Sequence, residues 1–147
     1  MPNLTVAVAV DRPMVIELLV APSEARAEEL RNAGLNVPLP ILVTALVDTG
    51  TKETLVERRV AEKLGLEPSD VRDVYGVGSG ETPVAGVVYL MRVIYAGVPA
   101  LDLASTVPVV AVEDLSRFGV RMLLGRDLLS RCVLIYNGPE GRGTFAF

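Results

Sequence analysis

One short segment of the chain combines a carboxylate with the setting that acid–base chemistry requires. The apolar run Ile41–Val47 follows two prolines and ends directly in Asp48, Thr49 and Gly50. The run is short and bounded by turn-forming residues, which predicts a buried strand. A carboxylate at the end of such a strand can be held rigidly, and the glycine lets backbone groups approach it closely. The tripeptide alone is also an ordinary turn, because aspartate and glycine favour turns for local reasons.

The residue types that the chain lacks narrow the possible chemistry. It contains no histidine, which excludes Ser–His and Cys–His nucleophiles, histidine-ligated metals and histidine acid–base catalysis. The single cysteine, Cys132, cannot form an internal disulfide or a multi-cysteine zinc site. We therefore expect no metal and no cofactor. Aspartate, glutamate, lysine, tyrosine and backbone groups remain as candidates for chemistry.

Charge and hydropathy restrict the partners. Fourteen basic and 18 acidic residues give a net charge of -4 and a pI near 4.9, which disfavours nucleic acid and anionic membranes. Half of the residues are hydrophobic, and the mean hydropathy of +0.43 suggests apolar surface that a partner covers. No secretory signal or membrane-spanning stretch is evident, so we expect a soluble, cytoplasmic protein.

The rest of the chain predicts mainly strands and a few helices. Strands are expected over residues 4–10, 14–20, 71–77, 82–95, 101–112, 122–124, 132–136 and 144–147. Helices are expected over 23–33, with Ser23 as N-cap and Gly34 as stop, over 54–64 from its helical spacing, and over 126–130. With 147 residues and no repeat or linker, we expect one domain, 1–147, with the 23–33 helix as an insertion.

A second motif follows a glycine-tipped hairpin in the second half of the chain. It consists of Leu124, Gly125, Arg126 and Asp127. The order of these features resembles that of the retropepsin-like aspartic protease family: a strand ending in Asp-Thr-Gly, then a helix, the hairpin and this motif. The resemblance begins near Arg12 and covers most of residues 10–147. It is closer to the cellular and bacterial members than to the compact viral enzymes.

The resemblance implies a mainly β fold, in which a closed, barrel-like sheet carries a flap hairpin and one or two helices. It implies that Asp48 is the catalytic aspartate of a homodimer, in a loop that Thr51 continues. Thr49 would hydrogen bond across the dimer, and Gly50 would offer its backbone to a peptide or protein substrate.

Two further segments receive roles from the same resemblance. Val77, Gly78, Ser79 and Gly80 would form the flap that closes over bound peptide. Leu124 and Gly125 would pack behind the active loop, and Arg126 and Asp127 would organise a helix near the dimer interface.

General acid–base chemistry agrees with this assignment. Two carboxylates that share one proton can hydrolyse a peptide bond, because the ionised one activates a water and the protonated one polarises the carbonyl. The chain holds a single Asp-Thr-Gly and no Asp-Ser-Gly. The second carboxylate must come from another copy, which makes a homodimer a requirement of the mechanism.

Several alternatives stay open. Lys52 stands where the family usually has an acidic residue, so Arg126 should pair with Glu53, Asp127 or another acid. This departure motivates an alternative function, a catalytically weak peptide-binding or assembly module. A third possibility is a monomeric barrel without a carboxylate pair.

The strands near both termini are either dimer interface elements or part of the monomer's own sheet. The helix over 23–33 presents either a solvated face or a docking surface.

Overall fold

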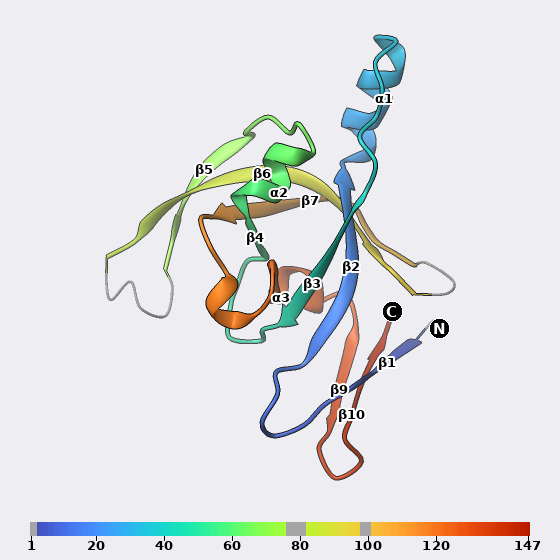
Figure 1. Ribbon diagram of the computed structural model, residues 1–147, viewed down its shortest axis with the longest axis vertical. Helices are drawn as coiled ribbons and strands as arrows, with labels where there is room; N and C mark the ends of the chain where they lie inside the picture. Colours follow the sequence, from blue (N-terminus) through green and yellow to red (C-terminus); the bar gives the residue numbers. More distant parts are fainter. Residues whose placement is uncertain (1–2, 76–81, 98–100) are drawn as a thin grey trace.

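Two β-sheets of unequal size form the framework of the fold (Figure 1). The computed structural model describes residues 3–75, 82–97 and 101–147. Its strands are β1 (Asn3–Ala7), β2 (Val15–Pro22), β3 (Ile41–Val47), β4 (Leu55–Glu57), β5 (Asp70–Val74), β6 (Val84–Tyr95), β7 (Leu101–Val112), β8 (Met122–Leu124), β9 (Val133–Asn137) and β10 (Arg142–Ala146). Its helices are α1 (Glu24–Asn32), α2 (Arg58–Lys63) and α3 (Arg126–Leu129), with a 3₁₀ turn η1 (Ser116–Phe118).

The larger sheet closes on itself. Its strand order is β2-β3-β8-β4-β7-β6-β5, and β2 also pairs with β6, so six strands form a barrel and β5 extends the sheet outside it. Closure leaves the barrel strands without free edges. The interior is filled by side chains from across the sequence, including Leu18, Val43, Met91 and Met122, each at most 1% exposed. The expected mainly β, barrel-like fold is confirmed.

The short strand β8 brings the two predicted motifs together. It lies between β3, to which it is parallel, and β4, to which it is antiparallel. The register places Leu124 beside Val47, the last residue of β3. All three β8 residues are buried, because strands flank β8 on both sides and side chains cover both of its faces. The segment after Leu124 therefore starts next to the loop that follows Val47.

The strands near the two termini form the smaller sheet, in the order β1-β10-β9. Leu4 pairs with Phe145 across β1 and β10, and both side chains are buried. The described ends of the chain therefore lie side by side (Figure 1). These strands complete a sheet within the chain, which is one of the two alternatives that the sequence left open. On the outer strand β9, Val133 and Ile135 remain 54% and 55% exposed.

The segment 54–64 differs from the expected single helix. Its first part is the strand β4, and only Arg58–Lys63 is helical. Leu55 and Val56 are both buried because β4 lies in the middle of the sheet, between β7 and β8, where both faces are covered. Adjacent buried residues followed by Val60 and Leu64 imitate the spacing of a helix face. The helix prediction for 54–57 is therefore wrong.

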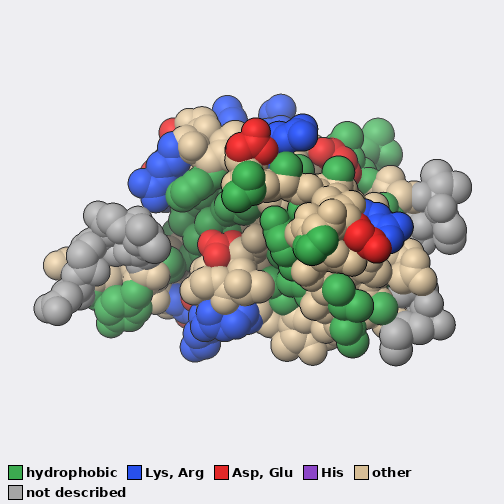
Figure 2. Space-filling model, turned by 90° about the horizontal axis from the view of Figure 1, so that it is seen from below, with side chains coloured by type: hydrophobic (Ala, Val, Ile, Leu, Met, Phe, Trp, Pro, Cys, Tyr) green, Lys and Arg blue, Asp and Glu red, His purple; other side chains and the backbone are tan. Residues whose placement is uncertain are grey.

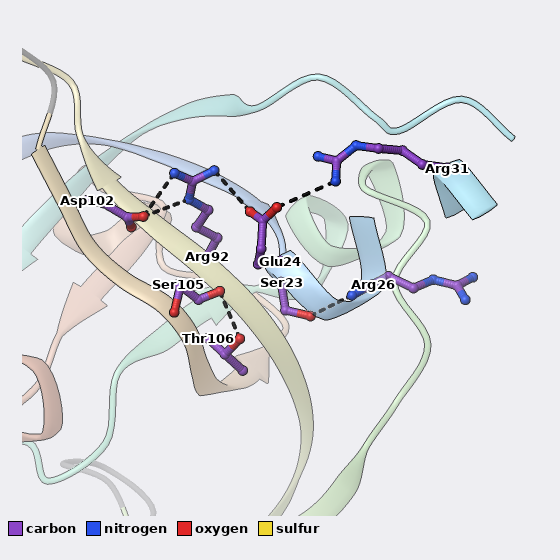
Figure 3. Close-up of polar contacts among 8 residues, drawn as sticks. All are labelled: Ser23, Glu24, Arg26, Arg31, Arg92, Asp102, Ser105 and Thr106. Atoms are coloured by element: carbon purple, nitrogen blue, oxygen red, sulfur yellow. Dashed lines mark hydrogen bonds and ion pairs between the residues drawn. The ribbon is translucent and has the colours of Figure 1, made fainter. Parts of the chain in front are cut away.

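Helix α1 projects beyond one end of the barrel (Figure 1). The Ser23 hydroxyl accepts a hydrogen bond from the Arg26 N–H at 3.3 Å, which confirms Ser23 as the N-cap. A line of exposed charges connects the helix to the barrel (Figure 3). Arg92 on β6 pairs with Asp102 on β7 at 2.9 Å and with Glu24 at 3.4 Å. Within the described residues, no helix is long and apolar enough to span a membrane.

Candidate active site

Backbone and side-chain contacts fix the position of Asp48 at the end of β3. Its N–H donates to the Leu124 carbonyl at 3.1 Å, which ties it to β8. The Gly50 N–H donates to Asp48 Oδ1 at 2.9 Å. Among the described residues, Oδ2 has no hydrogen-bond partner. Asp48 is partly buried, while Thr49 and Gly50 are exposed. One carboxylate oxygen is thus oriented by the loop, and the other is available.

Glycine at position 50 has a steric reason. A Cβ added there would lie 3.0 Å from Asp48 Oδ1. A side chain would therefore crowd the carboxylate, and the N–H of residue 50 could not keep its hydrogen bond without a shift.

Thr54 holds the loop from inside the protein. Its side chain is fully buried, and its hydroxyl donates to Asp127 Oδ1 at 2.6 Å while its N–H donates to Asp127 Oδ2 at 3.0 Å. The Gly125 N–H in turn donates to the Thr54 hydroxyl at 3.1 Å. The far end of the Asp48 loop is therefore joined to the start of α3 through buried polar groups, which would be costly to leave unpaired.

Gly125 allows this close approach. A Cβ at this position would lie 2.6 Å from both the carbonyl carbon and oxygen of Glu53 and 2.9 Å from the Thr54 nitrogen. These are backbone atoms of the loop, so they cannot swing aside. The structure accordingly brings the Leu124–Gly125 segment directly behind the loop that follows Asp48.

Arg126 has a different partner from the expected acid. Its Nη1 donates to the backbone carbonyl of Thr49 at 2.8 Å. Glu53 is instead paired with Arg72 on β5 at 2.8 Å, and both Asp127 oxygens are taken by backbone and hydroxyl donors. Within the described residues, the predicted pairing of Arg126 with Glu53, Asp127 or another acid is therefore wrong. The guanidinium braces the loop of Asp48, Thr49 and Gly50 directly, through a neutral carbonyl.

Two pockets open next to the loop. One of about 370 Å³ is lined by Lys52, Glu53, Arg72, Pro108, Arg126 and Asp127. The other, of about 500 Å³, is mostly apolar and lies between the loop and the terminal sheet. Its lining includes Met14, Leu46, Thr49, Leu134 and Tyr136. Seen from below, hydrophobic side chains are exposed between a few basic and acidic ones (Figure 2). Thr49 thus borders an apolar surface.

The expected flap residues Val77, Gly78, Ser79 and Gly80 lie outside the described residues. The two strands before and after them, β5 and β6, are paired antiparallel up to Val74 and Val84.

Two structurally important residues were not identified from the sequence as part of the site. Thr54 was read only as the start of a helix, and its partner Asp127 is 73 residues away. Glu57 is 1% exposed and accepts hydrogen bonds from Arg59, Arg121 and the Leu115 N–H. The one available signal for Glu57 was an acid directly after two apolar residues.

The environment of Glu57 shifts its titration. Burial alone would raise the pKa of its carboxyl, because desolvation disfavours the charged form. The hydrogen bonds from Arg59, Leu115 and Arg121 and the charge of Arg59 outweigh this effect and hold the pKa below its ordinary value of 4.5. Glu57 is therefore a buried anion that joins β4 to the segment entering β8.

No cluster that suits a metal ion is found in the part of the chain that the structure describes: nowhere do three Cys, Asp or Glu side chains group closely enough.

Comparisons with known proteins define the class. The fold is similar to that of a retropepsin-like aspartic protease from Rickettsia conorii, with a TM-score of 0.60 and 15% sequence identity over 99% of this chain and 91% of that chain. A family model described as aspartyl protease matches residues 40–128, more than half of the chain. The chain therefore belongs to this aspartyl protease family. No curated protein sequence gave a significant match.

The matched region contains both motifs of the site. It starts just before β3, includes Asp48 and its loop, and ends at Leu128, within α3. The family assignment supports an aspartic protease activity for this chain.

Proposed function

We propose that the protein is an aspartic endopeptidase that acts as a homodimer, with one Asp48 from each subunit forming the catalytic pair. The ionised carboxylate takes a proton from a bound water, and the protonated carboxylate donates a hydrogen bond to the peptide carbonyl. Attack of the water gives a tetrahedral intermediate, and proton transfer to the amine nitrogen releases the products.

The observation that carries this proposal is the setting of the Asp48 carboxylate. One oxygen is oriented by the Gly50 N–H at 2.9 Å, and the loop is fixed by Leu124 and Arg126. Such a group is positioned before substrate arrives, so little reorganisation is needed during the reaction. The second oxygen is free to meet a water or a second carboxylate.

The dimer follows from the chemistry. The chain has a single Asp-Thr-Gly, and one carboxylate cannot act as both general base and proton donor. The apolar pocket that Thr49 borders supports a second copy at this face, because an exposed apolar surface next to the loop would be covered. Within the pair, two carboxylates at close range titrate as a unit rather than separately.

We further propose an extended peptide or protein as substrate. The exposed backbone of Thr49 and Gly50 suits a strand-like chain that hydrogen bonds through its main chain. Nucleic acid and membranes are not proposed as partners, given the net charge of -4.

The test is cleavage of a complex peptide library, read by mass spectrometry at pH values from about 4 to about 7, which span the carboxyl titration range and above. The wild-type protein and the Asp48→Asn variant are compared, with sedimentation to establish the mass of each. Cuts that disappear in the variant support the proposal. A dimer that makes no Asp48-dependent cut at any pH would favour the peptide-binding or assembly module, and a monomer would contradict the paired mechanism.

A further inference from the structure

The pocket of about 370 Å³ next to the Asp48 loop has an unbalanced set of charges. Three cations and two carboxylates line it, which leaves one positive charge in excess. The partners of the two carboxylates decide which of the three cations remain available to a ligand.

Both carboxylates have partners other than Lys52 and Arg126. Asp127 uses both oxygens to accept from the N–H and hydroxyl of Thr54 and from the Leu128 N–H. Glu53 is paired with Arg72 at 2.8 Å, and Arg72 also pairs with Asp70 at 3.5 Å. The charge of Arg72 is therefore compensated by its own neighbours.

Two cations in the pocket have no acidic partner among the described residues. Arg126 donates to the neutral Thr49 carbonyl, and no carboxylate of the described residues lies within ion-pair distance of either Arg126 or Lys52. Lys52 is exposed, four residues after Asp48 in the same loop, so its ammonium can reach a ligand that enters the pocket. Pro108 adds an apolar wall.

We infer that Lys52 and Arg126 bind an acidic side chain of the peptide substrate, so that the enzyme prefers glutamate or aspartate at one position beside the cleaved bond. This inference rests on the proposed function and specifies its substrate class. A glutamate fits the site because its methylene groups can contact Pro108 while its carboxylate meets the two cations. Lys52 is the specificity residue, and Arg126 also keeps its role in bracing the loop.

The test uses one library peptide that is cleaved or, if none is cleaved, one that binds, in versions with Glu, Gln or Lys at each position. We expect Glu to be preferred over Gln by about five- to tenfold in kcat/KM at one position, since partly exposed charge-assisted pairs have this strength. Lys52→Glu should reverse the order and favour the Lys peptide. Lys63→Glu, the same change at the other lysine of the chain, is the matched control and should leave the preference unchanged.

Binding to the Asp48→Asn variant separates this inference from the proposed activity. Fluorescence anisotropy with the labelled Glu and Gln peptides reports the preference without turnover, and the preference should shrink as salt screens the charges. Asp48-dependent cleavage with no difference between Glu and Gln at any position would overturn the preference for an acidic side chain but not the proposed protease activity. Tighter binding of the Glu peptide without any cleavage would uphold the pocket and contradict the protease. Equal binding of both peptides together with no cleavage would overturn both.

Discussion

The loop that carries Asp48 and the helix α1 are attached to the barrel in different ways. The loop is held by buried or backbone hydrogen bonds to segments more than 70 residues away, chiefly through Thr54, Asp127 and Leu124. Helix α1 is connected through exposed ion pairs between long side chains, such as Arg92 with Glu24 (Figure 3). Buried polar contacts are expensive to break, whereas exposed ion pairs contribute little.

This difference indicates where the molecule tolerates substitutions. The geometry of the candidate site depends on a few buried groups that have no substitute. The projecting helix can vary in sequence without altering the loop. Substitutions in the two regions should therefore differ in their effect on both the free energy of unfolding and the activity.

The largest loss of stability is expected from a substitution at Gly125. Gly125→Ala places a methyl group 2.6 Å from the Glu53 carbonyl, and overpacking against backbone should cost about 3 kcal/mol of stability. Urea denaturation followed by circular dichroism measures the change. The control is Gly138→Ala, because an added Cβ there meets only a Tyr136 side chain at 3.4 Å. Equal stability of the two variants would show that the loop and β8 are not tightly packed.

The second largest loss of stability is expected from a substitution at Thr54. Thr54→Val keeps the shape of the side chain but leaves the Gly125 N–H without its hydroxyl acceptor. It also removes one of the two donors to Asp127 Oδ1, which keeps the Leu128 N–H. The expected cost is about 2 kcal/mol. Activity should fall as well, since the loop loses one of the contacts that hold it against α3. Thr106→Val is the matched control, because the Thr106 hydroxyl is exposed and donates only to the Ser105 carbonyl. A Thr54 variant as stable as this control would contradict the bracing role.

A smaller, pH-dependent effect is expected at Glu57. The folded protein holds the pKa of this carboxyl below 4.5, so its ionised form contributes stability above that pH, and the contribution is lost as the pH falls through the folded value. Glu57→Gln should cost about 1–2 kcal/mol at neutral pH, and the difference should narrow in acid.

Denaturation at several pH values between about 7 and about 3 measures this difference. Glu113→Gln, at an exposed ion pair with Arg58, provides the reference. A difference between Glu57→Gln and the wild type that stays constant over the whole range would rule out the titration of Glu57 as its source.

The smallest effect is expected in the α1 region. Arg92→Met removes the ion pairs with Asp102 and Glu24, and we expect a loss of at most about 1 kcal/mol with unchanged cleavage activity. Thermal denaturation and a peptide assay check both. A loss as large as that of Thr54→Val would mean that the helix and the loop are not attached differently after all.

The sequence predicted the parts of the fold that local pattern determines. The bounds of β3 and β8 and the N-cap Ser23 agree with the structure, because apolar runs and capping residues act locally. The helix prediction for segment 54–57 is wrong because β4 is a central strand with both faces buried, and its adjacent buried residues imitate the spacing of a helix face. The partners of Arg126 and Thr54 could not be predicted, since they are set by how β8 packs between β3 and β4.

The proposed mechanism needs two copies of Asp48 at one peptide bond, and mixing of subunits distinguishes it from catalysis by a single copy. Wild-type protein and Asp48→Asn are combined in varying ratios, allowed to exchange subunits, and assayed with one peptide substrate. If each active site needs both carboxylates, activity should follow the square of the wild-type fraction, which leaves about a quarter in an equal mixture. Activity proportional to the wild-type fraction would show that each chain works with its own Asp48 alone.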